Sequence, residues 1–232
     1  MKRFYKIAAH APCEGGHGIK LDDRPVRTPG RALLAVPGEA LAAGIAAEWN
    51  AQGEDINPAG MPMTGLANAA IDQIAPDPVR FAHDIAAYGE SDLLCYRADA
   101  PEPLVARQAE QWQPLLDWAA ERYEVRFAVT QGIVHVAQPQ ETLARLTEVV
   151  EALDPFTLAA LFKLVAISGS LIIGLAAIEK AFPLARLWQA AELDELWQAE
   201  QWGDDDEALG RRVARNAEFM TAAHFAELVA TA

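Results

Sequence analysis

Residues 164–178 read LVAISGSLIIGLAAI and form the most apolar stretch of the sequence, between Lys163 and Glu179. A membrane-spanning helix needs about 18–20 predominantly apolar residues, so this stretch is too short to cross a bilayer. It also contains Ser168-Gly169-Ser170 and Gly174, small residues that let two helices approach each other closely. The stretch therefore predicts a buried helical core.

Helical patterns surround this stretch and continue to the end of the chain. Five segments carry them: 141–153, 156–167, 170–181, 184–201 and 207–228. Four acidic residues at 204–207 complement the dipole at the start of the last helix. Because the composition shifts near residues 137–139, we expect a mainly α-helical C-terminal domain over residues 138–232.

The part of the chain before this shift combines short strands with helices. Strands are predicted at 4–8, 19–21, 24–27, 33–36 and 92–97, and a hairpin at 126–136. Helices are predicted at 39–52, 64–74 and 103–123, and Pro114 should kink or divide the last of these. The sequence thus predicts an α+β fold, in which a small N-terminal domain of antiparallel strands and helices over residues 1–137 precedes the helical domain.

The charge balance excludes one class of partner. Nineteen Lys and Arg against 33 Asp and Glu give a formal net charge of −14, and the only basic runs are Lys2-Arg3 and Arg211-Arg212. Nucleic-acid backbones are bound by clustered basic residues, so we expect no nucleic-acid partner and no binding to an anionic membrane surface. The shortness of the stretch 164–178 predicts that the chain does not insert into a membrane. Two cysteines are too few for a disulfide framework, and the apolar neighbours of Cys95 predict an inert buried thiol.

No pattern of catalytic residues stands out. His10, Cys13 and His17 are the strongest metal candidates, but their spacing matches no closed zinc pattern, and a hairpin loop explains them more simply. Ser170 lacks the G-x-S-x-G elbow of a hydrolase nucleophile. Residues 15–18 lack the Lys-Ser/Thr of a phosphate loop. We therefore expect a protein that is not an enzyme and that needs no metal, cofactor or small-molecule substrate.

Several stretches, taken in chain order, resemble one family. They are LDDRPVRTP at 21–29, EW at 48–49, MPMT at 61–64, LANAAID at 66–72 and DLLCYRA at 92–98, then Gln108, Trp112, Pro114 and Trp118, and finally Glu192, Glu195, Gln198 and QWG at 201–203. Together they resemble the Atp-twelve family of assembly chaperones for the F-type ATP synthase, over nearly the whole chain. Asp23 stands where that family commonly has Gly, and Ala69 where it commonly has Thr.

The resemblance implies a function in protein assembly. It implies that the chain binds the free α subunit of the ATP synthase and keeps it soluble until the β subunit replaces the chaperone. The mitochondrial members of the family need a presequence, and residues 1–6 show no such pattern. We therefore expect a bacterial cytoplasmic protein.

The partner-binding residues are predicted on the C-terminal helices. Glu192, Glu195, Gln198 and Trp202 follow one another at steps of three and four, which puts them on one face of a helix. Because unpaired carboxylates are rarely buried, this stripe suits a partner with an apolar patch rimmed by Arg or Lys. The alternative is that the carboxylates are merely solvated while Trp202 caps the helix end.

Two other functions stay open at this stage. One is a hydrolase or metal-dependent enzyme with an unrecognised site near His10, Cys13 and His17, which metal analysis of the purified protein would reveal. The other is a structural subunit that stays in a stable complex instead of binding its partner transiently.

Overall fold

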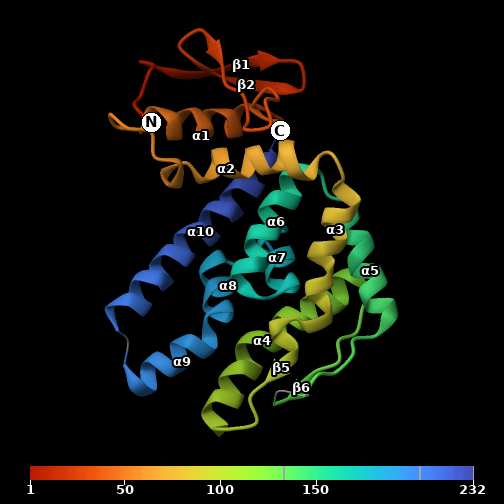
Figure 1. The fold of residues 1–232 in the computed structure, drawn as a ribbon. Helices are drawn as coiled ribbons and strands as arrows, with labels where there is room; N and C mark the ends of the chain where they lie inside the picture. Colours follow the sequence, from red (N-terminus) through yellow and green to blue (C-terminus); the bar gives the residue numbers. More distant parts are fainter. Residues whose placement is uncertain (133, 204, 232) are drawn as a thin grey trace. The chain divides into compact units, whose positions relative to one another are not determined.

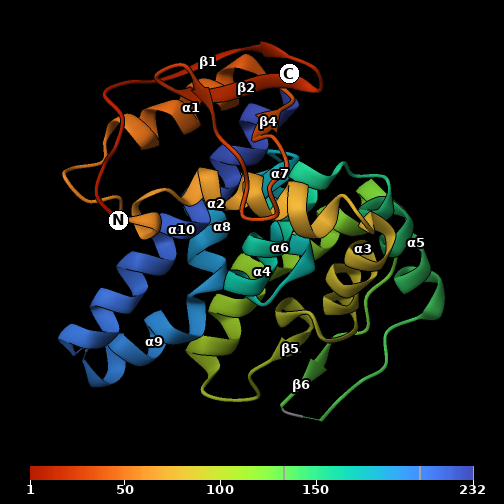
Figure 2. The ribbon, with the colours of Figure 1, turned by 45° about the horizontal axis from the view of Figure 1, so that its top comes forward.

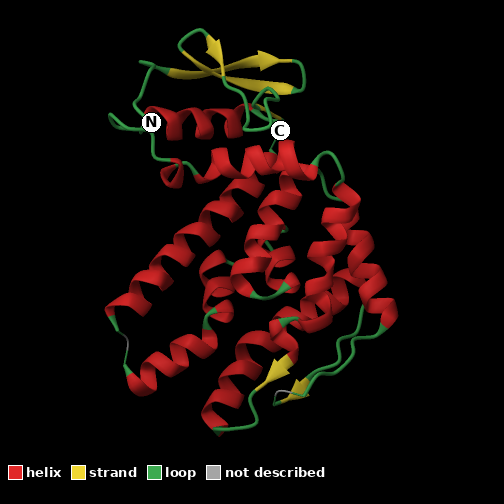
Figure 3. Cartoon of the chain, viewed as in Figure 1, coloured by secondary structure: helices red, strands yellow, loops and turns green. Residues whose placement is uncertain are grey.

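A computed structural model describes residues 1–132, 134–203 and 205–231. The chain divides into two compact units, the first made of Met1–Pro78, Asp154–Ala160 and Thr221 onward, the second of Val79–Leu153 and Leu161–Met220. Short strands and many helices confirm the predicted α+β fold class (Figure 3). Neither unit ends at residue 137, and the predicted domain division after that residue stays a prediction.

A small antiparallel sheet lies against helix α1 (Glu39–Asn50) in the first unit (Figures 1 and 2). Strand β2 (Gly16–Leu21) pairs with β1 (Ala8–Cys13), β3 (Arg24–Pro25) and β4 (Ala35–Val36). The first strand thus begins at Ala8, where the predicted strand 4–8 ends, and most of the predicted hairpin loop around residues 10–17 is regular strand. Gly16 permits the close approach of β4, because a Cβ there would lie 2.2 Å from the carbonyl oxygen of Val36.

Two carboxylates fasten the next helix of the first unit. Helix α2 (Pro62–Ala69) continues as a π-helical turn (Ala70–Ile74), close to the predicted bounds. Glu48 on α1 accepts hydrogen bonds from the backbone N–H groups of Met63 (2.7 Å) and Thr64 (2.8 Å), and so caps the start of α2. Asp72 accepts hydrogen bonds from Thr28 Oγ1 (2.6 Å) and Gly30 N (2.7 Å), and so ties the chain after β3 to the π-helical turn.

The second unit is mainly helical. It contains α3 (Pro78–Ala86) from its second residue onward, α4 (Glu102–Tyr123), α5 (Gln140–Glu151), α7 (Leu171–Ile178), α8 (Leu184–Ala191) and α9 (Leu193–Trp202), together with parts of α6 (Pro155–Ser168) and α10 (Asp206–Ala230). Helix α4 runs unbroken through Pro114, so the predicted division of this helix is wrong. The buried side chains of Trp112 and Leu115 stabilise the turns on both sides of the proline.

The apolar stretch 164–178 lies in the core as two helices. Gly169, with a φ of 68°, ends α6, and the hydroxyl of Ser170 caps α7 by accepting a hydrogen bond from Ile173 N (3.0 Å). A Cβ at Gly174 would lie 2.7 Å from Val165 Cγ2, which confirms that small residues here let two helices approach closely. Within the described residues, no helix is both long and apolar enough to span a membrane.

Two predicted strand segments take other forms. Residues 92–97 form a 3₁₀ turn (Leu93–Cys95) and the short strand β5 (Tyr96–Arg97), because Asp92 accepts a hydrogen bond from Leu94 N (3.0 Å) and turns the chain. Strand β6 (Thr130–Gln131) pairs with β5 in parallel, so the hairpin predicted at 126–136 is wrong for the described residues. The side chain of Gln138 bonds both backbone polar groups of Ala128, in place of a partner strand. Ile133 of the predicted hairpin lies outside the described residues.

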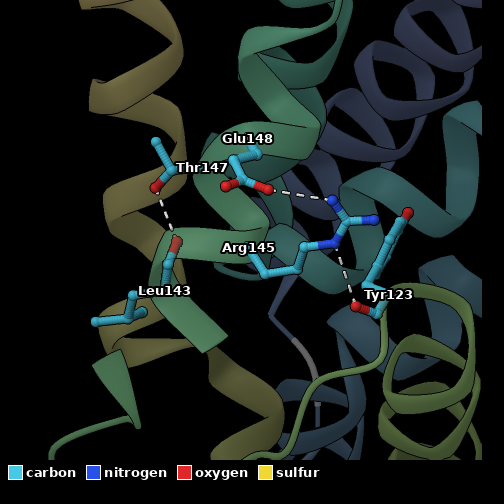
Figure 4. A network of polar contacts seen from close by, with 5 residues as sticks. All are labelled: Tyr123, Leu143, Arg145, Thr147 and Glu148. Carbon is cyan, nitrogen blue, oxygen red and sulfur yellow. Dashed lines mark hydrogen bonds and ion pairs between the residues drawn. The ribbon is translucent and has the colours of Figure 1, made fainter. Parts of the chain in front are cut away.

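Side-chain contacts in α5 and at the start of α10 stabilise these helices. Arg145 donates to the carbonyl of Tyr123 at the end of α4 (3.4 Å) and pairs with Glu148 (3.1 Å), while the hydroxyl of Thr147 donates to the carbonyl of Leu143 (2.8 Å) (Figure 4). Asp205, in the acidic run that was predicted to lie at the start of the last helix, caps α10 by accepting a hydrogen bond from Ala208 N (2.6 Å). Asp204 of that run lies outside the described residues.

Candidate partner-binding surface

Glu192 lies at a break between two helices. The single helix predicted over 184–201 is wrong, because Glu192, with φ −101° and ψ 13°, separates α8 from α9. Its side chain is 1% exposed and lies 2.9 Å from Arg215 and 3.8 Å from Arg212, both on α10. Burial raises the pKa of this carboxyl, and the two arginines oppose the shift. Glu192 is therefore an internal ion-pair partner, and its carboxylate does not share an exposed face with the other predicted residues.

The ion pair of Glu192 joins α10 to the helix break. Arg215 also donates to the carbonyl of Ile167 at the end of α6 (2.8 Å). One guanidinium thus contacts both the buried carboxylate and the C-terminal turn of another helix, where a positive charge complements the helix dipole. The carboxylate is the buried member of this pair, so removing the positive charge beside it would leave a buried charge poorly compensated, and Glu192 contributes to the structure of this region.

One side of α9 faces α4. Asp194 accepts a hydrogen bond from Gln108 Nε2 (2.8 Å), and Glu200 pairs with Arg107 (2.8 Å). The guanidinium of Arg107 also lies 4.9 Å from the ring centroid of Trp197, a cation–π distance. These contacts occupy positions 194, 197 and 200, which recur every three residues and so share the inner side of α9.

The opposite side of α9 is exposed. Glu195, Gln198 and Trp202 are exposed, and the Trp202 side chain has 79% of its surface accessible. We call these three residues the α9 outer face. The structure thus brings together three of the four predicted partner-binding residues and separates Glu192 from them. An exposed tryptophan beside a carboxylate has the composition of a protein-binding surface, since Trp is enriched where interfaces gain most of their energy.

The other two C-terminal tryptophans have internal roles. Trp188 packs against Phe219, with ring centroids 5.7 Å apart, and Trp197 lies beneath Arg107. Only Trp202 of these three is exposed, so it is the one that can contact a partner without disturbing the packing of the unit.

The metal alternative finds no support in the geometry. His10 and Cys13 lie on β1 and His17 on β2, and the rings of the two histidines are 6.3 Å apart. No group of three or more His, Cys, Asp or Glu side chains in the described residues could hold a metal ion. The structure therefore does not favour a metal-dependent enzyme at this hairpin.

Sequence reasoning missed several carboxylates that organise the structure. Asp92 is fully buried, and its carboxylate accepts from Leu94 N (3.0 Å) and Ile172 N (3.1 Å). Burial raises its pKa to about 6 despite these hydrogen bonds. An Asp side chain often accepts a hydrogen bond from the backbone N–H two residues later, so the sequence carries a local signal for the contact with Leu94. Nothing local predicts the contact with Ile172, nor the capping of α2 by Glu48.

Comparison with known proteins defines the class of this chain as a chaperone. The family model described as the ATP12 chaperone protein matches residues 2–120. The chain belongs to the ATP12 chaperone family, which is the family that the sequence motifs resemble.

Individual relatives agree with this assignment. The mitochondrial protein atp12 of Schizosaccharomyces pombe is 25% identical over 219 residues, which are 89% of this chain and 75% of that protein. The crystal structure of Atp12 from Paracoccus denitrificans is 43% identical and superposes with a TM-score of 0.93, over 98% of both chains. A crystal structure of a protein from Agrobacterium tumefaciens is 44% identical, with a TM-score of 0.93 over 97% of this chain and 85% of that one.

Proposed function

We propose that this chain is an assembly chaperone of the F-type ATP synthase that binds the free α subunit and releases it when the β subunit takes its place. Membership of the ATP12 chaperone family supports the general function. The observation that carries the binding proposal is the α9 outer face, where a largely exposed tryptophan adjoins an exposed carboxylate and amide. The two bacterial structures that the chain resembles support a bacterial cytoplasmic location as part of this proposal.

The physical requirements of the function fit this surface. An unassembled subunit exposes an apolar interface that aggregates unless it is covered. A chaperone that is displaced by the next subunit must bind less tightly than that subunit, so a small contact is sufficient. The charge of −14 also slows association with other acidic surfaces and favours a client with basic residues at the rim of its apolar patch.

A charge reversal on the α9 outer face tests the proposal. Glu195→Lys should weaken capture of purified α subunit by about 1–2 kcal/mol, roughly 5- to 30-fold, because Glu195 is exposed and contributes as a rim residue. Trp202→Ala should weaken capture by about 2 kcal/mol or more, if Trp202 fills a pocket of the partner. Both variants should keep the circular dichroism spectrum of the parent protein.

A matched control separates the surface from the charge change. Glu141 is also an exposed carboxylate in the first turn of a helix, α5, so Glu141→Lys changes the charge and the helix dipole contact equally. This variant should capture the α subunit as the parent does. Full capture by Glu195→Lys and Trp202→Ala would place the contact elsewhere. Failure of added β subunit to release the captured α subunit would instead favour a structural subunit of a stable complex.

A further inference from the structure

An apolar groove of about 590 Å³ opens on the first unit, well within the size range of ligand-binding clefts. Its walls come from the N-terminal segment, the chain around β3, the end of α1 and the start of α2. The side chains that shape it are Phe4, Val26, Pro29, Trp49, Ile56 and Met61. Phe4 is 61% exposed, so a large aromatic side chain stands at the edge of the groove without being covered by the chain itself.

The walls of the groove are fixed before any partner arrives. Glu48 caps α2 and thereby sets the position of Met61 and Thr64 relative to α1. Asp72 holds the turn at Thr28 and Gly30, which carries the other wall. A pre-formed apolar groove costs little ordering entropy when it binds, in contrast to a surface that must close around its ligand.

The groove has a charge opposite to that of the molecule. Arg24 and Arg27 are the charged side chains that line it, although the whole chain carries −14. Among the described residues neither guanidinium forms an ion pair, and Arg27 donates instead to the carbonyl of Arg31 (2.8 Å). Two exposed arginines without carboxylate partners leave a positive rim beside an apolar surface, and an Arg side chain can donate two parallel hydrogen bonds to one carboxylate.

The groove is also lined by several of the sequence stretches that carry the family resemblance and that lie outside the α9 outer face. Residues from 21–29, Trp49 and residues from 61–68 line it together, although they are separated along the chain. These are stretches on which the family resemblance rests, and the proposed contact of α9 gives them no role. A binding function of the groove would give these stretches a role.

We propose that this groove is a second client-binding site, which takes an extended polypeptide segment whose apolar side chains are flanked by carboxylates. The apolar side chains enter between Phe4, Trp49 and Met61, and a carboxylate contacts Arg24 or Arg27. An anionic membrane is a poor occupant, because the groove offers two arginines, whereas recognition of an anionic lipid surface takes a cluster of about 4–8 basic residues. A second copy of this chain is the other candidate, and the experiment below separates it from a client segment.

Peptide binding to the full-length protein tests the inference. The probe is a fluorescein-labelled peptide of about nine residues, about 30 Å when extended, in which Leu and Phe alternate with Asp. Fluorescence anisotropy should show saturable binding in the micromolar range. Replacing every Asp of the peptide by Lys should weaken binding about tenfold or more, and replacing every Leu and Phe by Ser should abolish it.

Two pairs of variants locate the bound peptide. Arg24→Glu and Phe4→Ala should each weaken binding about tenfold, since one removes the charge contact and the other the apolar edge. Their controls lie in the second unit: Arg126→Glu reverses another exposed arginine, and Val213→Ala truncates another exposed apolar side chain, which is 62% exposed. Both controls should bind the peptide as the parent does. If Arg24→Glu and Phe4→Ala bind the peptide as tightly as the parent does, the inference is overturned. The absence of saturable binding to the parent also overturns it.

The peptide experiment tests the groove whether or not the α subunit is the client. Glu195→Lys should leave peptide binding unchanged even where it weakens capture of the α subunit, so the two proposals fail separately. Light scattering of the free protein tests whether a second copy of the chain occupies the groove. A dimer that dissociates in Phe4→Ala would show that a second copy occupies the groove, and this result would overturn the assignment to a client segment.

Discussion

Gly174 offers a sharp test of how closely α6 and α7 are packed. A Cβ at this position would lie 2.7 Å from Val165 Cγ2 and 2.9 Å from Leu161 Cδ1. Carbon atoms prefer separations of about 3.5–4.0 Å, so Gly174→Ala forces an overlap of about 1 Å with two buried side chains. Overpacking of this kind costs about 1–3 kcal/mol.

In a helix with open space around the glycine, the same substitution should change the free energy of unfolding in the opposite direction. Replacing Gly by Ala inside a helix stabilises it by about 1 kcal/mol, through backbone entropy. Gly210 in α10 has no atom within 4 Å of a built Cβ, so Gly210→Ala should raise the free energy of unfolding by that amount. Because the propensity gain is common to both variants, the difference between them isolates the overlap. Gly174→Ala should be less stable than Gly210→Ala by about 1–3 kcal/mol.

Urea unfolding followed by far-UV circular dichroism measures this difference. Val165→Ala removes the nearest methyl group, so the double variant with Gly174→Ala should be more stable than the sum of the two single changes predicts, by about 1 kcal/mol. A stabilisation of Gly174→Ala equal to that of Gly210→Ala would refute the reasoning. So would strict additivity of the double variant.

Three further predictions concern buried groups and ligands. Burial raises the pKa of Asp92 from 3.8 to about 6, so the contribution of the protonated carboxyl to stability is present below about pH 4 and is lost as the pH rises through 6. Over this window the free energy of unfolding of the parent should fall by about 3 kcal/mol relative to that of Asp92→Asn. Equal pH dependence of the two proteins would contradict this prediction. Cys95 is fully buried and its pKa is raised to about 12, so a thiol reagent should label Cys13 in the native protein well before Cys95, and rapid labelling of Cys95 would argue against an inert thiol. The sequence lacks a phosphate loop, so calorimetry should detect no micromolar ATP binding by the purified protein.

Local patterns predicted the helices well and the short strands poorly. Helices α1, α5, α6 and α10 begin and end within two residues of their predicted bounds, because apolar periodicity reports the buried face directly. The segments 92–97 and 126–136 are apolar enough for strands, but the side chains of Asp92 and Gln138 satisfy backbone groups that a neighbouring strand would otherwise bond. Apolar periodicity does not report hydrogen bonds of this kind, even where the partners are as close in sequence as Asp92 and Leu94.

The candidate site shows the same limit. Positions 195, 198 and 202 share a face because they lie on one helix, and the spacing alone predicted that. Glu192 was misplaced because helix periodicity was extended across a break that the Arg212 and Arg215 contacts stabilise. The groove of the first unit had no signal beyond the family resemblance, since its walls meet through contacts between distant parts of the chain, among them those of Glu48 and Asp72.

The buried contacts of Asp92 and Trp112 set an order of events during synthesis. Asp92 bonds Ile172, 80 residues later, and Trp112 Nε1 donates to the carbonyl of Ala190 (2.8 Å), 78 residues later. Ribosomes add about 5–20 residues per second, so the apolar side of α4 waits roughly 4–16 s for the helices that cover it. The apolar stretch 164–178 emerges late, and helix α8, which carries Ala190, emerges after it. The chain therefore passes through a stage in which the apolar side of α4 is exposed, and this stage ends only when the helices up to α8 have left the ribosome.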